Sequence, residues 1–545
     1  MTLSAHTLAR ALRLAADEAH TLTRFLDDLD GWDGADCDTG TNAQLTLALM
    51  CESVAILNED APFTEALDCA INAGVEHGHG HIGVILTQVL AAWSKGLAGA
   101  RKITPVLART MLKTPITDEL SRCVLSPAIQ NSLKHASSAL DELGSTLPET
   151  PYLVSWFSLA VQNGLIQETD IESGALDPGA AVLALFFTCV DSALSGDSSV
   201  LESFAHMLSE LTEGKGRSPR QHAPSPGCEF AVDLVWQGTE SDAQALFDSI
   251  SRVGARFSSV GTIDPFGVGL LRLHVDTSAP LSARPRTGRI IRFAVADSRP
   301  DEEIGVDELA NEGISHRGVR LLERRPLRRV ERARVIVCTR APGIIEDLAR
   351  CGAIVLLDPH REDGAGILSI ARASSTGVTL FIPCDEPSAA LGEIIASRVN
   401  RNEVELSAPP SPGGALRRFL LASSHDELMA FTIVQATAGL FVPQPGGLQV
   451  AHTMERIVID AEKKALDHSA TRPIDSEDPA LIAQAVTDLE TAAASNWRLL
   501  LSRAHGPELV ALVRQFIFGT RSWQRDFEVL MGGQSGPSIL ERTQI

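Results

Sequence analysis

The feature that most constrains this fold is a change in the period of apolar residues after about residue 213. Before it, apolar residues recur every three or four positions, as at Leu8, Leu12, Ala15, Ala19, Leu22 and Leu26. This spacing forms one face of an amphipathic helix. Further helical runs are predicted at 42–52, 83–93, 129–143 and 180–194. We therefore predict an all-helical domain over residues 1–213.

A linker rich in Pro, Gly and Ser is predicted at residues 214–227. Beyond it the period becomes two, since Phe230, Val232, Leu234 and Trp236 alternate with other residues, as in a strand. A helical run and short strands near 256–260 and 270–275 follow. These patterns predict a small α/β middle domain over residues 228–282.

The remaining chain divides into a charged connector, 283–333, and a C-terminal domain, 334–545. The connector region holds an acidic run at 301–312 and eight arginines between 316 and 334. The arginine-rich segment is either a docking patch for an acidic partner or a solvated connector, and the second interpretation is favoured. From Arg334 onward strands alternate with helices, which predicts a parallel α/β fold with a Pro/Gly-rich break at 408–414. The predicted fold class is therefore multidomain: all-α, then small α/β, then α/β.

Composition limits the function classes. Over 545 residues, 47 basic and 69 acidic side chains leave a net charge of −22, which argues against nucleic-acid binding. The nine cysteines are scattered without a CxxC pair, as in a reduced cytosolic protein. No secretory signal is visible, and the most apolar stretch, 179–190, is too short to span a bilayer. We expect a cytoplasmic protein with no integral membrane segment.

The strongest chemical motif is a run of carboxylates that leads into a helix. Asp30, Asp36 and Asp38 lie within nine residues and are followed by Thr39, Gly40, Thr41 and Asn42. Hard divalent cations require clustered oxygen ligands, and hydroxyls with free N–H groups at a helix start can hold phosphate. The motif indicates either a metal–nucleotide site for phosphoryl transfer or an Asp-rich capped turn.

Two further loops precede apolar helices. The first contains His77, Gly78, His79, Gly80, His81 and Gly83. Its formal G-x-G-x-x-G match does not indicate a dinucleotide-binding fold, because no strand precedes it. Its alternating histidines suggest either a zinc or nickel site or a simple loop that leads into a helix, and the second is favoured. In the other loop, Asp177 can cap a helix that starts at Pro178 and continues with Gly179.

The three loops together resemble those of the dihydroxyacetone kinase L-subunit superfamily. Residues 26–42 are similar to its D-G-D-T-G-T-N metal loop, 78–90 to its R-G-N-S-G-V-I-L-S-Q loop and 173–185 to its D-P-G-A nucleotide loop. Segments 228–235 and 273–277 resemble the middle domain of the fatty acid kinase A subunit. Segments 337–358, 378–386 and 532–534 resemble its C-terminal domain. The resemblance thus covers nearly the whole chain and is thinner in the last two domains.

The resemblance implies a helical barrel that binds two Mg²⁺ ions and ATP. The implied metal ligands are Asp30, Asp36 and Asp38, and the implied nucleotide-binding residues are Thr39, Gly40, Thr41, Asn42, Gly80, His81, Gly83, Asp177 and Gly179. It also implies a homodimeric kinase subunit whose partner is a DegV-family fatty-acid-binding protein. The implied product is an acyl phosphate.

The chain departs from the family pattern at several positions. Cys37 replaces a Gly, His79 and His81 replace Arg and Asn, and Ile82 replaces a Ser that can contact phosphate. Gln130 and Asn131 replace a Gly-Thr pair. In the middle domain, the family's Cys/His/His set corresponds here to a candidate second metal set of Cys228, His274 and Asp276.

Three functional hypotheses remain open from the sequence. The chain is an active kinase, a degenerate kinase-like scaffold that binds a partner with weak or no catalysis, or a dihydroxyacetone (glycerone) kinase-like subunit. The complete carboxylate set favours activity, whereas Ile82, Gln130 and Asn131 favour the scaffold. The two extra domains favour the fatty acid kinase arrangement over the glycerone kinase one. No general base is assigned, because a carboxylate acceptor is already ionised near neutral pH.

Overall fold

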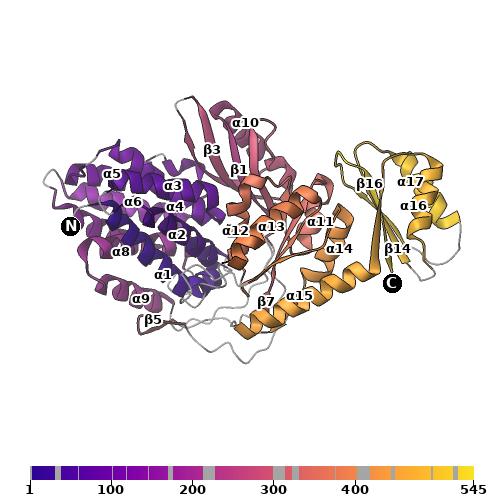
Figure 1. Ribbon diagram of the computed structural model, residues 1–545. Coiled ribbons are helices and arrows are strands. Elements are labelled where there is room, and N and C mark those ends of the chain that lie inside the picture. Colours follow the sequence, from indigo (N-terminus) through magenta and orange to yellow (C-terminus); the bar gives the residue numbers. More distant parts are fainter. Residues whose placement is uncertain are drawn as a thin grey trace. The chain divides into compact units, whose positions relative to one another are not determined.

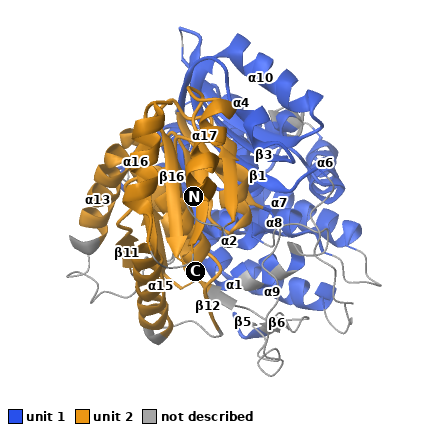
Figure 2. Ribbon diagram, turned by 90° about the vertical axis from the view of Figure 1, so that its right-hand side faces the viewer, with its two compact units in different colours: residues 1–290, 298–328, 410–413 blue, residues 291–297, 329–409, 414–545 orange. Residues whose placement is uncertain are grey.

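The structure is a computed structural model that describes residues 3–30, 38–58, 61–100, 102–117, 119–144, 147–169, 176–212, 227–264, 266–298, 314–321, 330–374, 376–401, 418–443, 448–491, 495–519 and 526–544. The chain divides into two compact units (Figure 2). Unit 1 comprises residues 1–290, 298–328 and 410–413, and unit 2 comprises 291–297, 329–409 and 414–545. The protein is multidomain, with a helical N-terminal region followed by sheet-containing regions.

The described residues up to 212 form helices and no strand (Figure 1). These are α1 (Ala5–Asp30), α2 (Thr39–Ala55), α3 (Phe63–His77), α4 (Gly80–Leu97), α5 (Pro105–Thr117), η1 (Glu119–Arg122), α6 (Pro127–Glu142), α7 (Thr150–Glu168), α8 (Pro178–Ser195) and α9 (Ser199–Thr212). All five predicted helical runs lie within or almost within these helices, so the all-helical prediction is confirmed. Their core contains a cluster of aromatic rings from Trp93, Phe157, Phe186 and Phe187.

Helix α1 is stabilised by burial of the apolar face that the sequence predicts. Each of the six residues that defined this face is at most 1% exposed. Burial of this amphipathic face supplies most of a helix's stability in a protein. Helix α2 approaches α1 closely at Gly40, where a Cβ atom would overlap the carbonyl oxygen of Thr23 and lie 2.8 Å from Cβ of Leu26. Glycine at this position therefore sets the distance between the two helices.

Helix α8 is long and apolar enough to cross a membrane by length and composition. It spans 18 residues, so the expectation that this segment is too short was wrong. However, 83% of its apolar window is buried within the protein. Phe186, Phe187 and Cys189 on this helix belong to the helical core. Its apolar character is thus used in packing, as in a core helix of a soluble protein.

Unit 1 also contains three antiparallel strands. Strand β3 (Val268–Thr277) pairs on one side with β1 (Phe230–Thr239) and on the other with β2 (Arg256–Ile263). Helix α10 (Glu240–Arg252) connects β1 to β2 and begins with a capping box formed by Thr239 and Asp242. A short helix, η2 (Pro280–Ala283), follows β3. The predicted strand–helix–strand–strand order is confirmed.

The predicted connector contains regular structure. Strand β4 (Arg289–Asp297), hairpin strands β5 (Ile314–His316) and β6 (Val319–Leu321), and β7 (Val330–Arg332) all lie within 283–333. The hairpin is attached to α1, because Glu18, only 6% exposed, pairs with His316 at 2.5 Å and with Arg317. Part of this segment is therefore a docked element and not a solvated connector.

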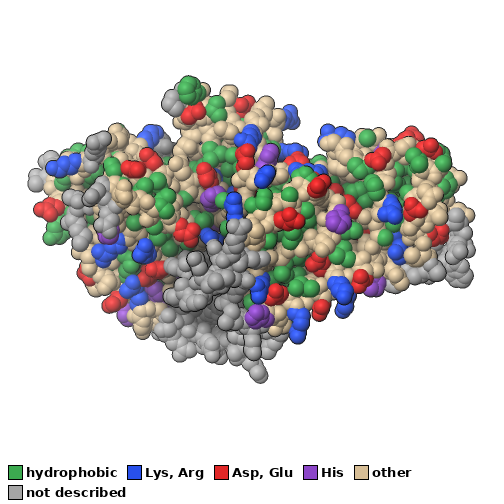
Figure 3. All heavy atoms as spheres, in the orientation of Figure 1, with side chains coloured by type: hydrophobic (Ala, Val, Ile, Leu, Met, Phe, Trp, Pro, Cys, Tyr) green, Lys and Arg blue, Asp and Glu red, His purple; other side chains and the backbone are tan. Residues whose placement is uncertain are grey.

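The described arginines of the connector make contacts inside the protein. Arg317 pairs with Glu18, Arg332 lies over the ring of Phe441, and Arg334 donates to the carbonyl of Ala373. Most of the remaining arginines of the run lie outside the described residues. On the face shown in Figure 3, acidic and basic side chains are interspersed. The docking-patch interpretation therefore does not apply to these three arginines.

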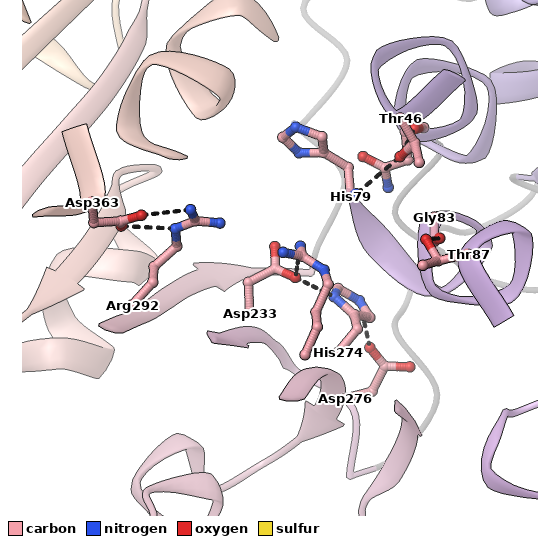
Figure 4. Close-up of polar contacts among 11 residues, drawn as sticks. Thr46, His79, Gly83, Thr87, Asp233, His274, Asp276, Arg292 and Asp363 are labelled. Atoms are coloured by element: carbon pink, nitrogen blue, oxygen red, sulfur yellow. Dashed lines mark hydrogen bonds and ion pairs between the residues drawn. The ribbon is translucent and has the colours of Figure 1, made fainter. Parts of the chain in front are cut away.

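Unit 2 contains the predicted parallel sheet. Strands β11 (Arg418–Leu421), β10 (Val378–Ile382), β8 (Arg334–Thr339) and β9 (Ile354–Leu357) run parallel in that order, and β4 pairs antiparallel with β9. The connecting helices are η3 (Pro342–Ile344), α11 (Ile345–Arg350), η4 (Arg361–Asp363), α12 (Gly364–Arg372), α13 (Glu386–Arg401), α14 (Glu427–Thr437) and α15 (Leu448–His468). Arg292 of β4 and Asp363 form a buried ion pair, drawn at the left of Figure 4.

The end of unit 2 forms a second, mixed sheet. Its strand order is β13 (Ser469–Ile474), β16 (Ser538–Gln544), β14 (Ser495–Leu501) and β15 (Phe527–Met531). Helices α16 (Pro479–Leu489) and α17 (Pro507–Gly519) pack with it around Trp497. A short pair of β12 (Phe441–Pro443) with β7 completes the described elements.

Candidate functional site

The start of α2 holds the described part of the predicted metal–phosphate loop. Asp38 occupies the position before the helix, and its carbonyl accepts from the backbone N–H of Asn42 at 2.8 Å. Asp27 of α1 accepts from both the N–H and the hydroxyl of Thr41, at 2.9 and 2.8 Å. The loop end is therefore held by a carboxylate that the sequence analysis did not single out.

The start of α4 packs directly against the first turns of α2. Gly80 has a φ of +59°, and a Cβ atom there would overlap the side-chain amide of Asn42. The N–H of His79 donates to Thr46 Oγ1 at 3.0 Å, and a Cβ atom at Gly83 would lie 2.6 Å from the same oxygen. The structure thus brings two of the three predicted loops together, and glycine is required where they touch.

His81 in the first turn of α4 reaches strands β2 and β3 of the same unit. Its Nε2 lies 2.9 Å from Asp276 Oδ2, and its Nδ1 lies 2.8 Å from Ser258 Oγ. The ring of His81 meets that of His274 edge-on, with centroids 4.5 Å apart. His274 Nε2 lies 3.7 Å from Asp276 Oδ1. One donor atom from each of His81, His274 and Asp276 lies within 4.8 Å of the other two.

His274 is oriented by a carboxylate on the side opposite Asp276. Its Nδ1 lies 3.1 Å from Asp233 Oδ1, which also accepts from Arg272 at 2.9 Å. Figure 4 shows His274 between Asp233 and Asp276, next to the loop that carries His79. The register of the sheet causes this arrangement, since Asp233 of β1 and Ser258 of β2 are both paired with His274 of β3. The three residues are direct cross-strand neighbours.

The ionisable groups of the cluster are buried and shift one another's pKa values. Burial by itself would raise the pKa of Asp276, but His81, His274 and Arg256 lower it to about 2. Burial lowers the pKa of His81, against the influence of Asp276. For His274, burial is outweighed by Asp233, Asp276 and Asp38, so its pKa is raised. Asp38 is therefore within electrostatic range of this cluster.

Cys228 lies near the cluster but outside the group of convergent donor atoms. Burial, and secondarily Asp276, raises the pKa of its thiol. Among the described residues, the group that can hold a metal consists of His81, His274 and Asp276. The structure thus combines two members of the candidate second metal set with a histidine from the helical region, in place of Cys228.

The third predicted loop contacts α6. Asp177 caps α8 by accepting from the N–H of Ala180 at 2.6 Å, and a Cβ atom at Gly179 would lie 3.0 Å from Ile129 Cδ1. Gln130 donates to the carbonyl of Leu125, and Asn131 donates to Glu168. The helix cap expected from the sequence is confirmed. The nucleotide role of Asp177 and Gly179 stays a prediction.

Several predicted site residues lie outside what the structure describes. These are Asp36, Cys37 and the side chain of Asp30. Of the three predicted magnesium ligands, only Asp38 can therefore be placed, and the magnesium set stays a prediction.

Sequence reasoning missed Asp27, Ser258 and Asp233, which hold Thr41, His81 and His274 in place. Asp233 carried no clear signal, because it occupies an alternating position between Val232 and Leu234 where a strand commonly carries a polar residue. No sequence pattern marks Ser258 either. Searches of protein-family models and of curated protein sequences gave no match to this chain.

Proposed function

We propose that unit 1 is an ATP- and Mg²⁺-dependent phosphotransferase. The observation that carries this proposal is the direct packing of the α2 and α4 starts at Asn42 and Gly80, with Asp38 beside them. First-turn N–H groups of a helix attract anionic phosphate. A missing Cβ at Gly80 allows close approach to the backbone. Carboxylates at the same end suit Mg²⁺.

Bound Mg²⁺ would neutralise phosphate charge during transfer. The chain's own contribution is to hold the loop that carries its ligands, which Asp27 does through Thr41. Following the family resemblance, we propose a fatty acid carried by a DegV-family protein as acceptor, with an acyl phosphate as product. Such a carboxylate is already ionised near neutral pH, so a general base is unnecessary.

The test of this proposal is a calorimetric titration of ATP with and without Mg²⁺. We expect binding that requires Mg²⁺ and that falls on the order of hundredfold in Asp38→Ala, since one charged contact is worth about 1.5–3 kcal/mol. Asp248→Ala changes an exposed carboxylate on α10 of the same unit and should leave binding unchanged. Equal affinity in Asp38→Ala and the native protein would show that Asp38 does not hold the nucleotide's metal.

One observation favours the alternative of a kinase-like scaffold. His81, at a position that contacts phosphate in the resembling family, is held by Ser258 and Asp276. The Thr41 hydroxyl is likewise bound to Asp27. If these side chains serve only to fix the loops, unit 1 presents a rigid surface to a partner and transfers phosphate slowly or not at all.

Acyl phosphate formation separates the two functions. We expect slow but measurable turnover with a long-chain fatty acid on a DegV-family protein, and none with dihydroxyacetone. The double change Gln130→Gly with Asn131→Thr restores the family's residues at exposed positions of α6. It should raise turnover about tenfold if one phosphate contact is recovered. Partner binding that is unaffected by nucleotide, without any turnover, would support the scaffold.

Restoring a serine at position 82 is not an equivalent test. Ile82 is 4% exposed and belongs to the helical core. Ile82→Ser would leave a cavity and bury a hydroxyl, at a cost of about 3 kcal/mol or more. A loss of activity in this variant would therefore report on stability and not on phosphate contacts.

A further inference from the structure

We propose that His81, His274 and Asp276 form a transition-metal site of their own, with zinc as the ion that fits best. None of its three ligands belongs to the proposed magnesium set, and the proposal does not rest on magnesium or nucleotide binding. It also differs from the Cys/His/His set that the family resemblance implies, because the ligand from the helical region replaces the cysteine.

The first argument is the convergence of suitable donors. Two imidazole nitrogens and one carboxylate oxygen lie within 4.8 Å of one another. Zn–N bonds of about 2.0–2.1 Å place tetrahedral ligands about 3.3 Å apart. His81 Nε2 lies 2.9 Å from Asp276 Oδ2, and His274 Nε2 lies 3.7 Å from Asp276 Oδ1, so both separations are close to that value. Drawing the donor atoms from within 4.8 Å to that spacing requires side-chain movements of about 1.5 Å at most.

The second argument is the orientation of the two rings. In each, the Nδ1 atom faces an oxygen of the protein, from Ser258 for His81 and from Asp233 for His274. In each, the Nε2 atom faces Asp276. A histidine that binds metal through one nitrogen usually donates the other N–H to an oxygen acceptor, most often a carboxylate, a backbone carbonyl or water. Asp233, itself held by Arg272, provides such a carboxylate.

Ser258 can play the same role for His81. Its oxygen already accepts from the N–H of Val124 at 2.9 Å. A hydroxyl has two lone pairs, so it can also accept an Nδ1–H from His81. That tautomer leaves Nε2 of His81 without a proton, as a metal ligand requires. Ser258 thereby connects the site to the loop before α6.

The donor set identifies the class of metal. Imidazole nitrogen suits Zn²⁺ and other late first-row ions, whereas Mg²⁺ prefers oxygen. Three protein ligands leave one position for water or substrate, which is typical of catalytic and not structural zinc sites. Because the ligands come from α4 and β3, the ion would also connect the helical region of unit 1 to its sheet.

The test uses the full chain stripped of metal by a chelator, and then titrated with Co²⁺ or Zn²⁺ alone, without nucleotide. We expect one equivalent of metal per chain. The cobalt form should show the visible bands of a nitrogen–oxygen site and lack the near-ultraviolet charge-transfer band of a cobalt–thiolate bond. His81→Gln, His274→Gln and Asp276→Asn should each abolish stoichiometric binding.

Control variants distinguish the proposed ligands from the Cys/His/His set of the resembling family. Cys228→Ser should retain binding, and His77→Ala, in the same loop as His81, should retain it too. Asp233→Asn should weaken binding 10- to 100-fold through its effect on His274. Circular dichroism of each stripped variant controls for unfolding. A thiolate band, or loss of binding in Cys228→Ser with retention in His81→Gln, would assign the family's ligand set instead. Failure of the folded native protein to bind metal would overturn the proposal.

Discussion

At the scale of single residues, the protein places ionisable groups at the ends of strands and helices. In unit 2, Glu427 begins α14 and is 5% exposed. It accepts from the Thr339 hydroxyl at 2.7 Å and from the Arg340 N–H at 2.5 Å, both at the carboxyl end of β8. Burial, which the two hydrogen bonds oppose, raises its pKa to about 7. Glu427 thus joins a helix start to the central strand.

The pH dependence of unit 2 should follow from Glu427. Its folded pKa lies above the ordinary value of 4.5, so the native state binds the proton more tightly than the unfolded chain. The resulting stabilisation is complete below pH 4.5 and is lost as the pH rises through about 7. Its full extent is about 3 kcal/mol. We expect the unfolding free energy of the native protein, relative to that of Glu427→Gln, to fall as the pH rises from 4 to 8. A constant difference would contradict it.

A second residue-scale prediction concerns Gly40. Gly40→Ala introduces a Cβ that would overlap the Thr23 carbonyl oxygen and approach Leu26 Cβ to 2.8 Å. We expect a loss of about 2 kcal/mol or more, because backbone and a buried side chain must both move. Thermal unfolding measures it. Gly439→Ala provides the comparison, since a Cβ there meets nothing within 4 Å. It should leave the melting temperature unchanged or slightly raised.

At the scale of elements, the β5–β6 hairpin shows how a charged segment becomes ordered. Glu18 lies on α1 with its carboxylate buried, and the side chains of His316 and Arg317 pair with it. The hydrogen bonds and charges of these two residues lower the pKa of Glu18 against the effect of burial. The hairpin is therefore fixed by one carboxylate that pairs with two side chains.

Loss of that carboxylate should release the hairpin. Glu18→Ala leaves the positive charge of Arg317 without its partner, and breaking such a pair costs about 3–5 kcal/mol when it is buried. We expect faster amide hydrogen exchange over residues 314–321, with the helices unchanged. Glu210→Ala, an exposed change on α9, is the control. Equal exchange rates in Glu18→Ala and the native protein would show that other contacts hold the hairpin.

At the scale of the whole molecule, the hydrophobic clusters described for the two units consist of different residues. The helical core of unit 1 and the two clusters of unit 2 share no residue. The residues that we propose to bind metal all belong to unit 1, whereas Glu427 belongs to unit 2. Changes in metal and in pH should therefore act on different parts of the chain.

Calorimetry should resolve this separation. We expect two thermal transitions, of which Zn²⁺ raises only one, because ligands stabilise the state that binds them. His274→Gln should remove the zinc effect, and Glu427→Gln should alter the other transition alone. A single transition that responds equally to zinc and to Glu427→Gln would show that the units unfold together.

The sequence by itself determined which segments form helices, which form strands, and where the chain changes from one to the other. Apolar spacing of three and four residues predicted α1, α2, α4, α6 and α8, and alternation predicted β1, because these periods follow from local backbone geometry. The alternation of strands and helices also predicted that β8, β9 and β10 are parallel, since parallel strands require crossover connections. The segment at 283–333 was misjudged, because β4 and the hairpin are stabilised by partners distant in the chain.

Only the tertiary structure decided which polar residues meet. His81 appeared as one of three alternating histidines, and nothing nearby in sequence distinguished it from His77 or His79. Its partners Ser258, His274 and Asp276 lie more than 170 residues away, and strand register places them side by side. Asp27 was passed over for Asp30, yet Asp27 is the carboxylate one helical turn back that holds Thr41. Local periodicity is set by the backbone and is legible in sequence, whereas a binding site is set by contacts between distant segments.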